Sequence, residues 1–204
     1  TNGQAYNIAP WSYSGSEGNA YNFGGNLANA SAGYAPQVVD WVLVSLRLNP
    51  ENGSEKICQR AGLLYSDGHI EFAAGTNCCA LDPAESFYVV IEHRNHLIVM
   101  SHAAVPVVNG TLNYDFRNKQ SYLNDGIGLG GYFAQNEVLP GVFAMYAGNG
   151  DQTSNTTADT DINAGDFGKW RNNGAQQRTY NILDFNMDGE VSSLDFDLWE
   201  RNAT

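Results

Sequence analysis

The sequence predicts a mostly β protein, an antiparallel β-sandwich followed by a small α-helical unit. Residues 36–147 hold six or seven short segments rich in β-branched and aromatic residues, separated by turn signals. Residues 148–204 hold two copies of a loop rich in Asp and Asn, each followed by a helix-like stretch. Residues 1–35 show neither pattern, and their Gly, Asn, Ser and Tyr content predicts an extended arm. We therefore expect an arm, a sandwich and a helical unit, in that order.

The strand predictions follow from composition and alternation. The run 38–47, VVDWVLVSLR, is β-branched and aromatic and lies between two prolines. Asp67-Gly68 is a hairpin signal between two apolar runs. In residues 87–94, apolar side chains alternate strictly between two faces. The pattern is typical of an immunoglobulin-like or prealbumin-like sandwich, with strands expected at 38–47, 61–65, 69–72, 87–94, 96–101, 111–116 and 142–146.

The segment 184–195 has the spacing of a twelve-residue calcium-binding loop. Oxygen-bearing side chains occupy positions 1, 3, 5, 9 and 12, and position 7 offers a backbone carbonyl. Gly189 stands at position 6, where the chain must turn sharply. An Asx-rich surface turn would share some of these features, but five matches at fixed spacing favour calcium. The predicted ligands are Asp184, Asn186, Asp188, Glu190 (through its carbonyl), Ser192 and, in place of the usual Glu, Asp195.

A weaker copy of this loop ends at Asp166, and its ligand frame is open. Transferring the frame directly gives Asn155, Thr157 and Asp159 as the early ligands, with Thr160 in place of the glycine. In the alternative frame the loop opens earlier and residues 152–158 form an insertion. We expect calcium in the second loop and a second ion in this one. The candidate ligands of the first loop are Asn149, Asp151, Asp159, Asp161, Asn163 and Asp166.

Each loop runs directly into a short helix with Phe and Trp three residues apart. Phe167 with Trp170, and Phe196 with Trp199, are expected to pack together as a two-fold-like unit. This tandem resembles the dockerin type of duplicated calcium module over residues 148–204, with a specific match in the second loop and a weak match in the first. The resemblance implies that the helices could recruit a cohesin partner.

A wider resemblance rests on four strings, at residues 38–47, 90–97, 115–117 and 141–148. They are similar to a recurrent module of secreted Bacteroidota surface proteins, and the similarity covers most of residues 7–204. The resemblance implies a sandwich that runs directly into a duplicated calcium unit, in large surface or secreted proteins that often use the type IX route. It does not imply an activity, because such modules are mostly uncharacterised.

Charge and cysteine content limit the partners and the cellular location that we expect for the chain. The chain carries 22 acidic and 10 basic residues, and no basic stripe, which argues against nucleic acid as a partner. No apolar run approaches the roughly 18 residues of a spanning helix, so we expect no membrane insertion. Simple calcium loops suit extracellular calcium, which predicts an extracellular or cell-surface location. Cys58 could form a disulfide with Cys78 or with Cys79, leaving one odd thiol.

The motifs in the sequence favour a structural or adhesion role over catalysis. The stretch 92–96 with His102 is the one cluster suited to acid–base or metal chemistry, and no nucleophile or phosphate-loop motif occurs. We therefore expect no catalysis, and a calcium-stabilised structural or adhesion module that self-associates or binds other surface proteins. Strand addition by the arm to an open sheet edge would build a fibre. The alternative is a cohesin-recruiting or carbohydrate-binding module, whose glycan-facing aromatics would be Trp11, Tyr13, Tyr122 and Tyr132.

Overall fold

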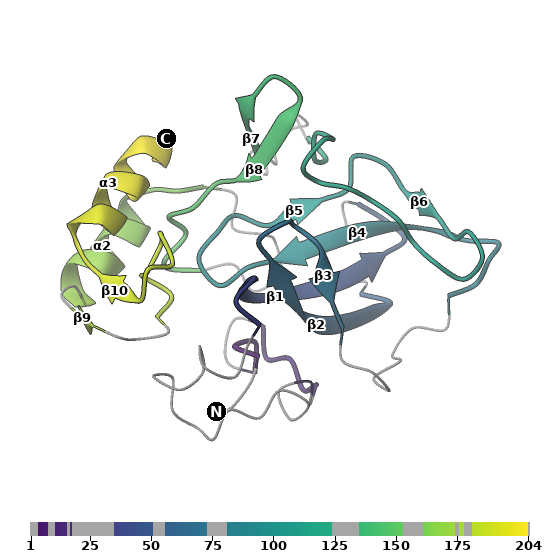
Figure 1. The fold of residues 1–204 in the computed structure, drawn as a ribbon, viewed down its shortest axis with the longest axis horizontal. Helices are drawn as coiled ribbons and strands as arrows, with labels where there is room; N and C mark the ends of the chain where they lie inside the picture. The colour runs from purple at the N-terminus through teal and green to yellow at the C-terminus, as the bar shows by residue number, and fades with distance from the viewer. Residues whose placement is uncertain are drawn as a thin grey trace.

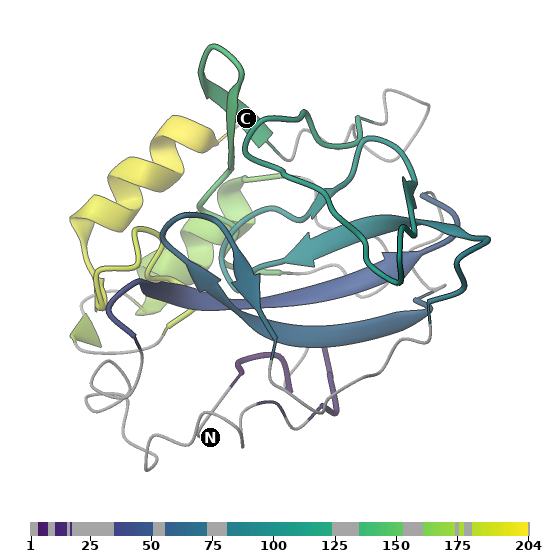
Figure 2. The same ribbon diagram turned by 45° about the vertical axis from the view of Figure 1, so that its right-hand side comes forward.

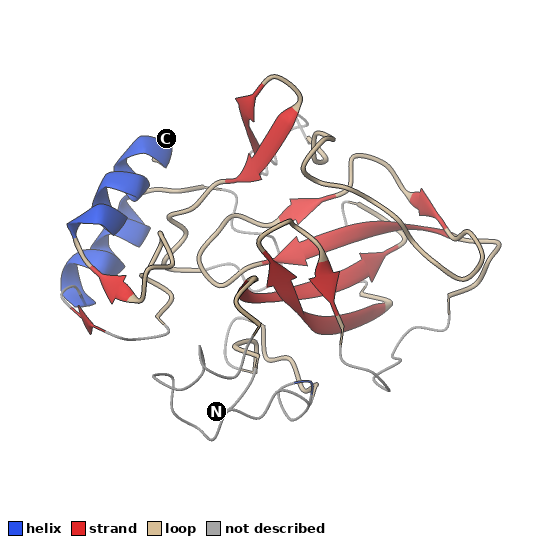
Figure 3. Cartoon of the chain, in the orientation of Figure 1, coloured by secondary structure: helices blue, strands red, loops and turns tan. Residues whose placement is uncertain are grey.

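The computed structural model describes residues 4–7, 11–15, 17, 35–50, 56–72, 81–123, 135–152, 161–173, 176–177 and 181–203. Within these ranges the predicted fold class is confirmed, since antiparallel sheets dominate and two short helices lie near the C-terminus (Figure 3). The strands are β1 (Val38–Arg47), β2 (Cys58–Tyr65), β3 (Ile70–Glu71), β4 (Ser86–Glu92), β5 (Val99–Met100), β6 (Val105–Pro106), β7 (Gln135–Leu139), β8 (Val142–Met145), β9 (Gln176–Gln177) and β10 (Glu190–Val191). The helices are α2 (Ala164–Asn173) and α3 (Ser193–Asn202).

The main sheet has six strands in the order β3-β2-β1-β4-β5, with β6 paired to the far end of β4. Every pair is antiparallel, and β1 is the long central strand, with β2 on one side and β4 on the other. The predicted hairpin joins β2 to β3, and Gly68 takes a φ of 86° in its turn. Two smaller sheets pair β7 with β8 and β9 with β10.

One face of the main sheet is covered by the N-terminal segment. Trp41 and Leu43 of β1 lie on this face, in a buried cluster that includes Tyr6. The Tyr6 hydroxyl donates a hydrogen bond to the Trp41 carbonyl at 2.8 Å, and Trp11 and Tyr13 pack on the same cluster. Figure 2 shows this segment beneath the sheet. Burial of large aromatic side chains therefore anchors the described part of the arm to the sheet.

The opposite face of the sheet is covered by residues that follow β5. Val42, Ile91 and Val99 form its centre, and Phe116 and Met145 pack over them. Leu46 and Phe87 continue the same face in a buried cluster with Val107, and Leu112 packs against this cluster. In Figure 2 the segment after β5 and the β7–β8 hairpin lie above the sheet. The two faces of β1 thus contact different layers, as alternation along a strand requires.

One predicted strand is absent from the described residues, and the strand β7 was not predicted. Residues 111–116 were predicted as a strand and alternate in polarity, but apart from an isolated bridge at Thr111 they form a loop. Leu112 and Phe116 still pack onto the sheet, so the alternation reflects burial of one face without strand pairing. The strand β7 was missed because its five residues are mainly polar or exposed. Hydrogen bonds from Gln135 Nε2 to the Phe116 carbonyl and from Phe143 N to the Arg117 carbonyl fix its hairpin to the body.

The helices lie side by side at one end of the main sheet (Figure 1). None of the helices in the described ranges is long and apolar enough to cross a membrane. Cys58 is disulfide-bonded, and the two cysteines that could be its partner, Cys78 and Cys79, lie outside the described residues.

Candidate metal centre

The second predicted loop is organised by its last residue, Asp195. This side chain is fully buried, and its Oδ1 accepts hydrogen bonds from Phe185 N at 2.7 Å and Asn186 N at 3.1 Å. Its Oδ2 accepts from Ser192 N at 2.7 Å, and the Ser192 hydroxyl accepts from Leu194 N in a capping box that starts α3. One carboxylate thereby joins the first, middle and last parts of the loop.

The first residue of this loop, Asp184, closes the turn from the other side. Its Oδ1 accepts from Asp188 N at 3.1 Å, and its Oδ2 accepts from Gly189 N at 3.0 Å. Gly189 has a φ of 88°, the left-handed conformation predicted for position 6. Asp188 is exposed, and its Oδ1 accepts from Glu190 N at 2.9 Å. The six predicted ligands of the second loop therefore come from one continuous turn.

The first loop repeats this arrangement around Asp166, which is also fully buried. Asp166 Oδ1 accepts from Gly150 N at 2.7 Å and Asp151 N at 3.0 Å, and its Oδ2 accepts from Asn163 N at 2.7 Å. These donors match, in order, the three donors to Asp195. The fourth residues of the two loops, Gln152 and Met187, both have positive φ, at 48° and 61°.

This correspondence helps to choose between the two possible ligand frames of the first loop. It makes Asn149 and Asp151 the counterparts of Asp184 and Asn186, which favours the frame with an insertion. Asp161 and Asn163 are exposed and lie directly before α2. The remaining candidate, Asp159, lies outside the described residues, as do Asn155 and Thr157 of the direct frame.

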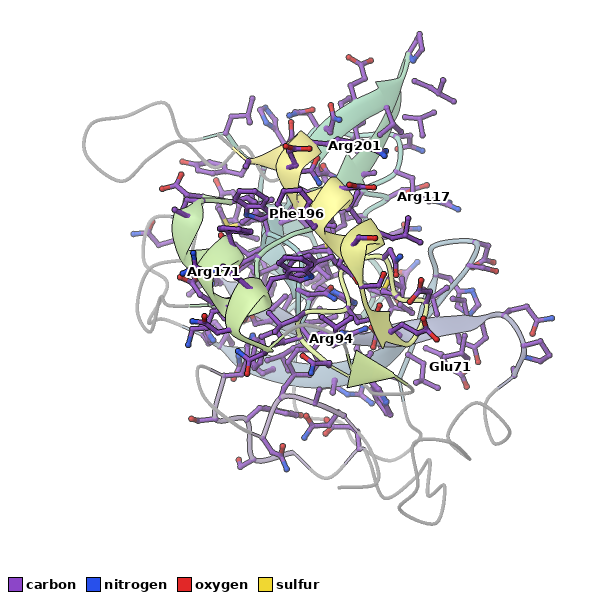
Figure 4. The ribbon with its side chains drawn as sticks, turned by 90° about the vertical axis from the view of Figure 1, so that its left-hand side faces the viewer. Glu71, Arg94, Arg117, Arg171, Phe196 and Arg201 are labelled. Carbon is purple, nitrogen blue, oxygen red and sulfur yellow. The ribbon has the colours of Figure 1, made fainter. Side chains whose placement is uncertain are left out.

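The two repeats are joined by reciprocal contacts of their tryptophans. Trp170 Nε1 of the first repeat donates to the Ser192 carbonyl of the second at 3.2 Å, and Trp199 Nε1 of the second donates to the Asn163 carbonyl of the first at 3.1 Å. The predicted aromatic packing is confirmed, with Phe167 5.0 Å from Trp199 between ring centroids. In Figure 4, Phe196 lies between the two helices. Each loop is therefore held by the helix of the other repeat.

Burial sets the electrostatics of the two loops. Removal from water raises the pKa of the Asp166 carboxyl, and it also raises the pKa of Asp184, where nearby Arg94 acts in the opposite direction. Arg94 Nη2 lies 3.9 Å from Asp184 Oδ2, with both side chains almost fully buried. Sequence reasoning did not connect Arg94 with the loops. Buried carboxylates of raised pKa gain most from a bound cation.

The donor atoms suit a hard cation. Carboxylate, amide, hydroxyl and carbonyl oxygens are the ligands of Ca²⁺, and each carboxylate oxygen that accepts one N–H keeps a further lone pair. Among the described residues, no three His, Cys, Asp or Glu side chains are gathered closely enough to hold a metal by themselves. The predicted set differs from such a cluster, since Asn186, Ser192 and the Glu190 carbonyl supply three of its six donors. The chemistry of the donors fits calcium better than zinc or iron.

The other candidate sites take structural positions. His93 Nδ1 lies 2.9 Å from His96 Nδ1, and His93 Nε2 lies 3.2 Å from Asp40 Oδ2. These side chains form a network between β1 and the segment that follows β4. Trp11 and Tyr13 are half-buried against the sheet, and Tyr122 packs edge-on against Tyr88. Tyr132 lies outside the described residues. The three described aromatics do not form a flat exposed row.

Acid is expected to destabilise the fold through His96. Burial, followed by the charges of His93 and Arg94, holds the pKa of His96 well below its usual value, although Asp40 opposes the shift. The unfolded chain takes up this proton near pH 6.5, so the stabilising contribution is complete above that pH and is lost as the pH falls below it. At constant calcium, the melting temperature should therefore be lower at pH 5.5 than at pH 7.5.

Two variants test the assignment of this pH dependence. His96→Asn keeps a group that can bond to the Asn95 amide and should flatten the decrease between pH 7.5 and 5.5. His102→Asn removes an exposed histidine and should leave the decrease unchanged. An undiminished decrease in His96→Asn would show that another group is responsible.

The chain shows little similarity to known proteins. No family model matches the chain, and no curated protein matches it. Two solved structures share a limited likeness, both mutants of a type II cohesin–X–dockerin complex from Acetivibrio cellulolyticus. The N-terminal interface mutant is 18% identical, with a TM-score of 0.41 and 80% of each chain covered. The C-terminal interface mutant is 17% identical, with a TM-score of 0.39, covering 79% of this chain and 80% of that one. At these TM-scores the likeness supports no conclusion about shared architecture or function.

Proposed function

We propose that this chain is a non-catalytic, calcium-stabilised module of an extracellular bacterial surface or secreted protein, working in adhesion or assembly. Two Ca²⁺ ions, one in each loop, would hold the helical unit in a fixed orientation against the sheet. The observation that carries the proposal is the matching set of three backbone N–H bonds to Asp166 and to Asp195. Two loops that repeat the same hydrogen bonds are suited to the same ligand.

Charge gives the ions a physical role. Residues 148–204 contain ten acidic and four basic residues, and most of the acidic residues belong to the two loop segments. Bound divalent cations would offset this repulsion and neutralise carboxylates that are buried at some cost. Loops of this kind bind at concentrations found outside cells, which agrees with the extracellular setting implied by the sequence resemblance.

Close packing between the sheet and the helical unit supports a structural function. The chain enters the unit at Gly148, where an added Cβ would lie 3.2 Å from Ile162 Cγ2 and 3.3 Å from the Trp199 backbone. Asn202 Nδ2, at the end of α3, donates to the Ala147 carbonyl at 2.8 Å. Ala147 also forms an isolated β-bridge with His96. A rigid junction of this kind would keep the two parts in one orientation, as a spacer or assembly module requires.

Calcium is expected to stabilise the protein, and Asp188→Asn is expected to remove part of that effect. An ion at about 100 times its dissociation constant adds roughly 2.7 kcal/mol to the free energy of unfolding. Asp188 is exposed and contributes only short-range bonds, so its replacement should cost little in excess chelator. Thermal unfolding of both proteins, with calcium and with chelator, measures the difference.

Asp197→Asn is the matched control. Asp197 is an exposed acid on α3, two residues beyond Asp195, and it is not a predicted ligand. Its replacement should leave the calcium-dependent rise in melting temperature intact. Equal loss of the rise in both variants would point to a general effect of charge, and no rise in the wild-type protein would refute the proposal.

A further inference from the structure

The corner between β4 and β5 contacts the second loop through two side chains. Arg94 Nε donates to Asp40 Oδ2 of β1 at 2.9 Å, while its Nη1 donates to the Asn181 carbonyl and its Nη2 lies 3.9 Å from Asp184 Oδ2. Asn95 Nδ2 donates to the Asp184 carbonyl. Arg94 is 4% exposed and Asn95 is fully buried. Figure 4 shows Arg94 where the helical unit meets the sheet. The guanidinium therefore connects β1 directly to the start of the second loop.

The same corner contacts the first loop through its backbone carbonyls. Gln152 Nε2 donates to the Arg94 carbonyl at 3.2 Å. Gly148 N and Asn149 N donate to the Asn95 carbonyl at 3.0 and 3.2 Å. Asn149 and Asp184 are the opening residues of the two loops, so two consecutive residues of the corner between β4 and β5 hold the same position in both repeats.

We propose that Arg94 and Asn95 are positioning residues for ion binding, which fix the opening residue of each loop and couple both loops to the main sheet. This inference rests on the proposed calcium function. It assigns a task to the Glu-His-Arg-Asn-His stretch, which the sequence presented as a cluster suited to acid–base chemistry. Ion binding at one end of the molecule would thereby stabilise strands of the sheet.

Geometry, and not charge, is the main contribution of Arg94. A cation near a calcium ligand would by itself oppose a second cation, but Asp40 lies 2.9 Å from the guanidinium and neutralises it. The planar fork of Arg donates at once to Asp40 on β1 and to the Asn181 carbonyl just before the second loop, and it also forms an ion pair with Asp184 at 3.9 Å. A Lys side chain keeps the charge but presents a single nitrogen, so Arg94→Lys isolates the contribution of the fork.

The test compares calcium binding and segment-specific hydrogen exchange in the full chain. Arg94→Lys should weaken calcium binding by about tenfold, the usual effect of losing a group that orients a metal ligand. In the wild-type protein, added calcium should slow exchange in β1 and β4 as well as in α2 and α3. In Arg94→Lys the slowing should be confined to the helices. A residue that merely adds stability would lower protection everywhere and leave this calcium response unchanged.

Two further variants make the test decisive. Arg201→Lys is the matched control, because Arg201 is exposed at the end of α3 (Figure 4). This variant should bind calcium as the wild-type protein does. Gln152→Asn tolerates the positive φ but shortens the reach to the Arg94 carbonyl, and it should weaken coupling through the first loop even if Arg94→Lys folds poorly.

The outcomes separate the two proposals. Unchanged calcium affinity together with a retained response of β1 in Arg94→Lys and Gln152→Asn would overturn the positioning role while leaving calcium binding intact. Absence of calcium binding by the wild-type chain would overturn both.

Discussion

Asp195→Ala is expected to destabilise the helical unit strongly, whether or not calcium is present. The buried carboxylate accepts three backbone N–H groups, and its removal leaves these donors without their partner. The expected loss is on the order of 3 kcal/mol in the free energy of unfolding, because unsatisfied buried donors cost about 1–3 kcal/mol each and the most exposed of them can be rehydrated. Denaturant unfolding in calcium and in excess chelator measures this loss.

Comparison with Asp188→Asn separates the structural task of Asp195 from ion binding. The cost of Asp195→Ala should persist in chelator, since the protein itself supplies the N–H donors. The cost of Asp188→Asn should be confined to the protein with calcium. If the two variants were equally stable in chelator, Asp195 would not organise the loop in the way its hydrogen bonds indicate.

Asp40→Ala is expected to destabilise the protein to an extent comparable with Asp195→Ala, because it removes the carboxylate that pairs with Arg94. Asp40 is buried on β1 and contacts both Arg94 Nε and His93 Nε2. Removing it leaves a buried guanidinium without this carboxylate, and breaking a buried pair typically costs about 3–5 kcal/mol. The melting temperature should fall sharply, and the chain should require more calcium to fold.

The ion pair between Asp115 and Arg117 is an exposed counterpart of the buried pair between Asp40 and Arg94. It is bidentate, with one contact at 2.8 Å, and Arg117 holds the pKa of Asp115 down to about 2, yet Arg117 is largely exposed. Exposed pairs contribute about 1 kcal/mol or less, so Asp115→Ala should have little effect. Similar losses in Asp40→Ala and Asp115→Ala would show that the Asp40–Arg94 contact is less buried in solution than in the structure.

The sequence predicted those features whose signals are local. The strand β1 was predicted to its exact residues because a β-branched run between prolines leaves little alternative. The turn at Gly189 was predicted because a positive φ at position 6 favours glycine. Pairing of the aromatic residues on α2 and α3 followed from helical spacing and the similarity of the repeats.

Features that depend on distant residues could not be predicted in this way. Arg94 and Asn181 are 87 positions apart, and nothing in either neighbourhood indicates their contact. The frame of the first loop stayed open because Gly150, which donates to Asp166, lies 16 positions before it, and the matching hydrogen bonds are apparent only in three dimensions. The polar strand β7 is specified by its partner β8 and by the hydrogen bond from Gln135 to the Phe116 carbonyl, neither of which leaves a periodic pattern in the sequence.

Calorimetric titration of Ca²⁺ into the chelator-treated chain tests the central claim most directly, with Mg²⁺ as the competing ion. Two loops with oxygen donors predict saturable binding of two calcium ions, little competition from magnesium and loss of one site in Asp188→Asn. The absence of binding heat at millimolar calcium, with identical melting curves in calcium and in excess chelator, would contradict a calcium-stabilised module.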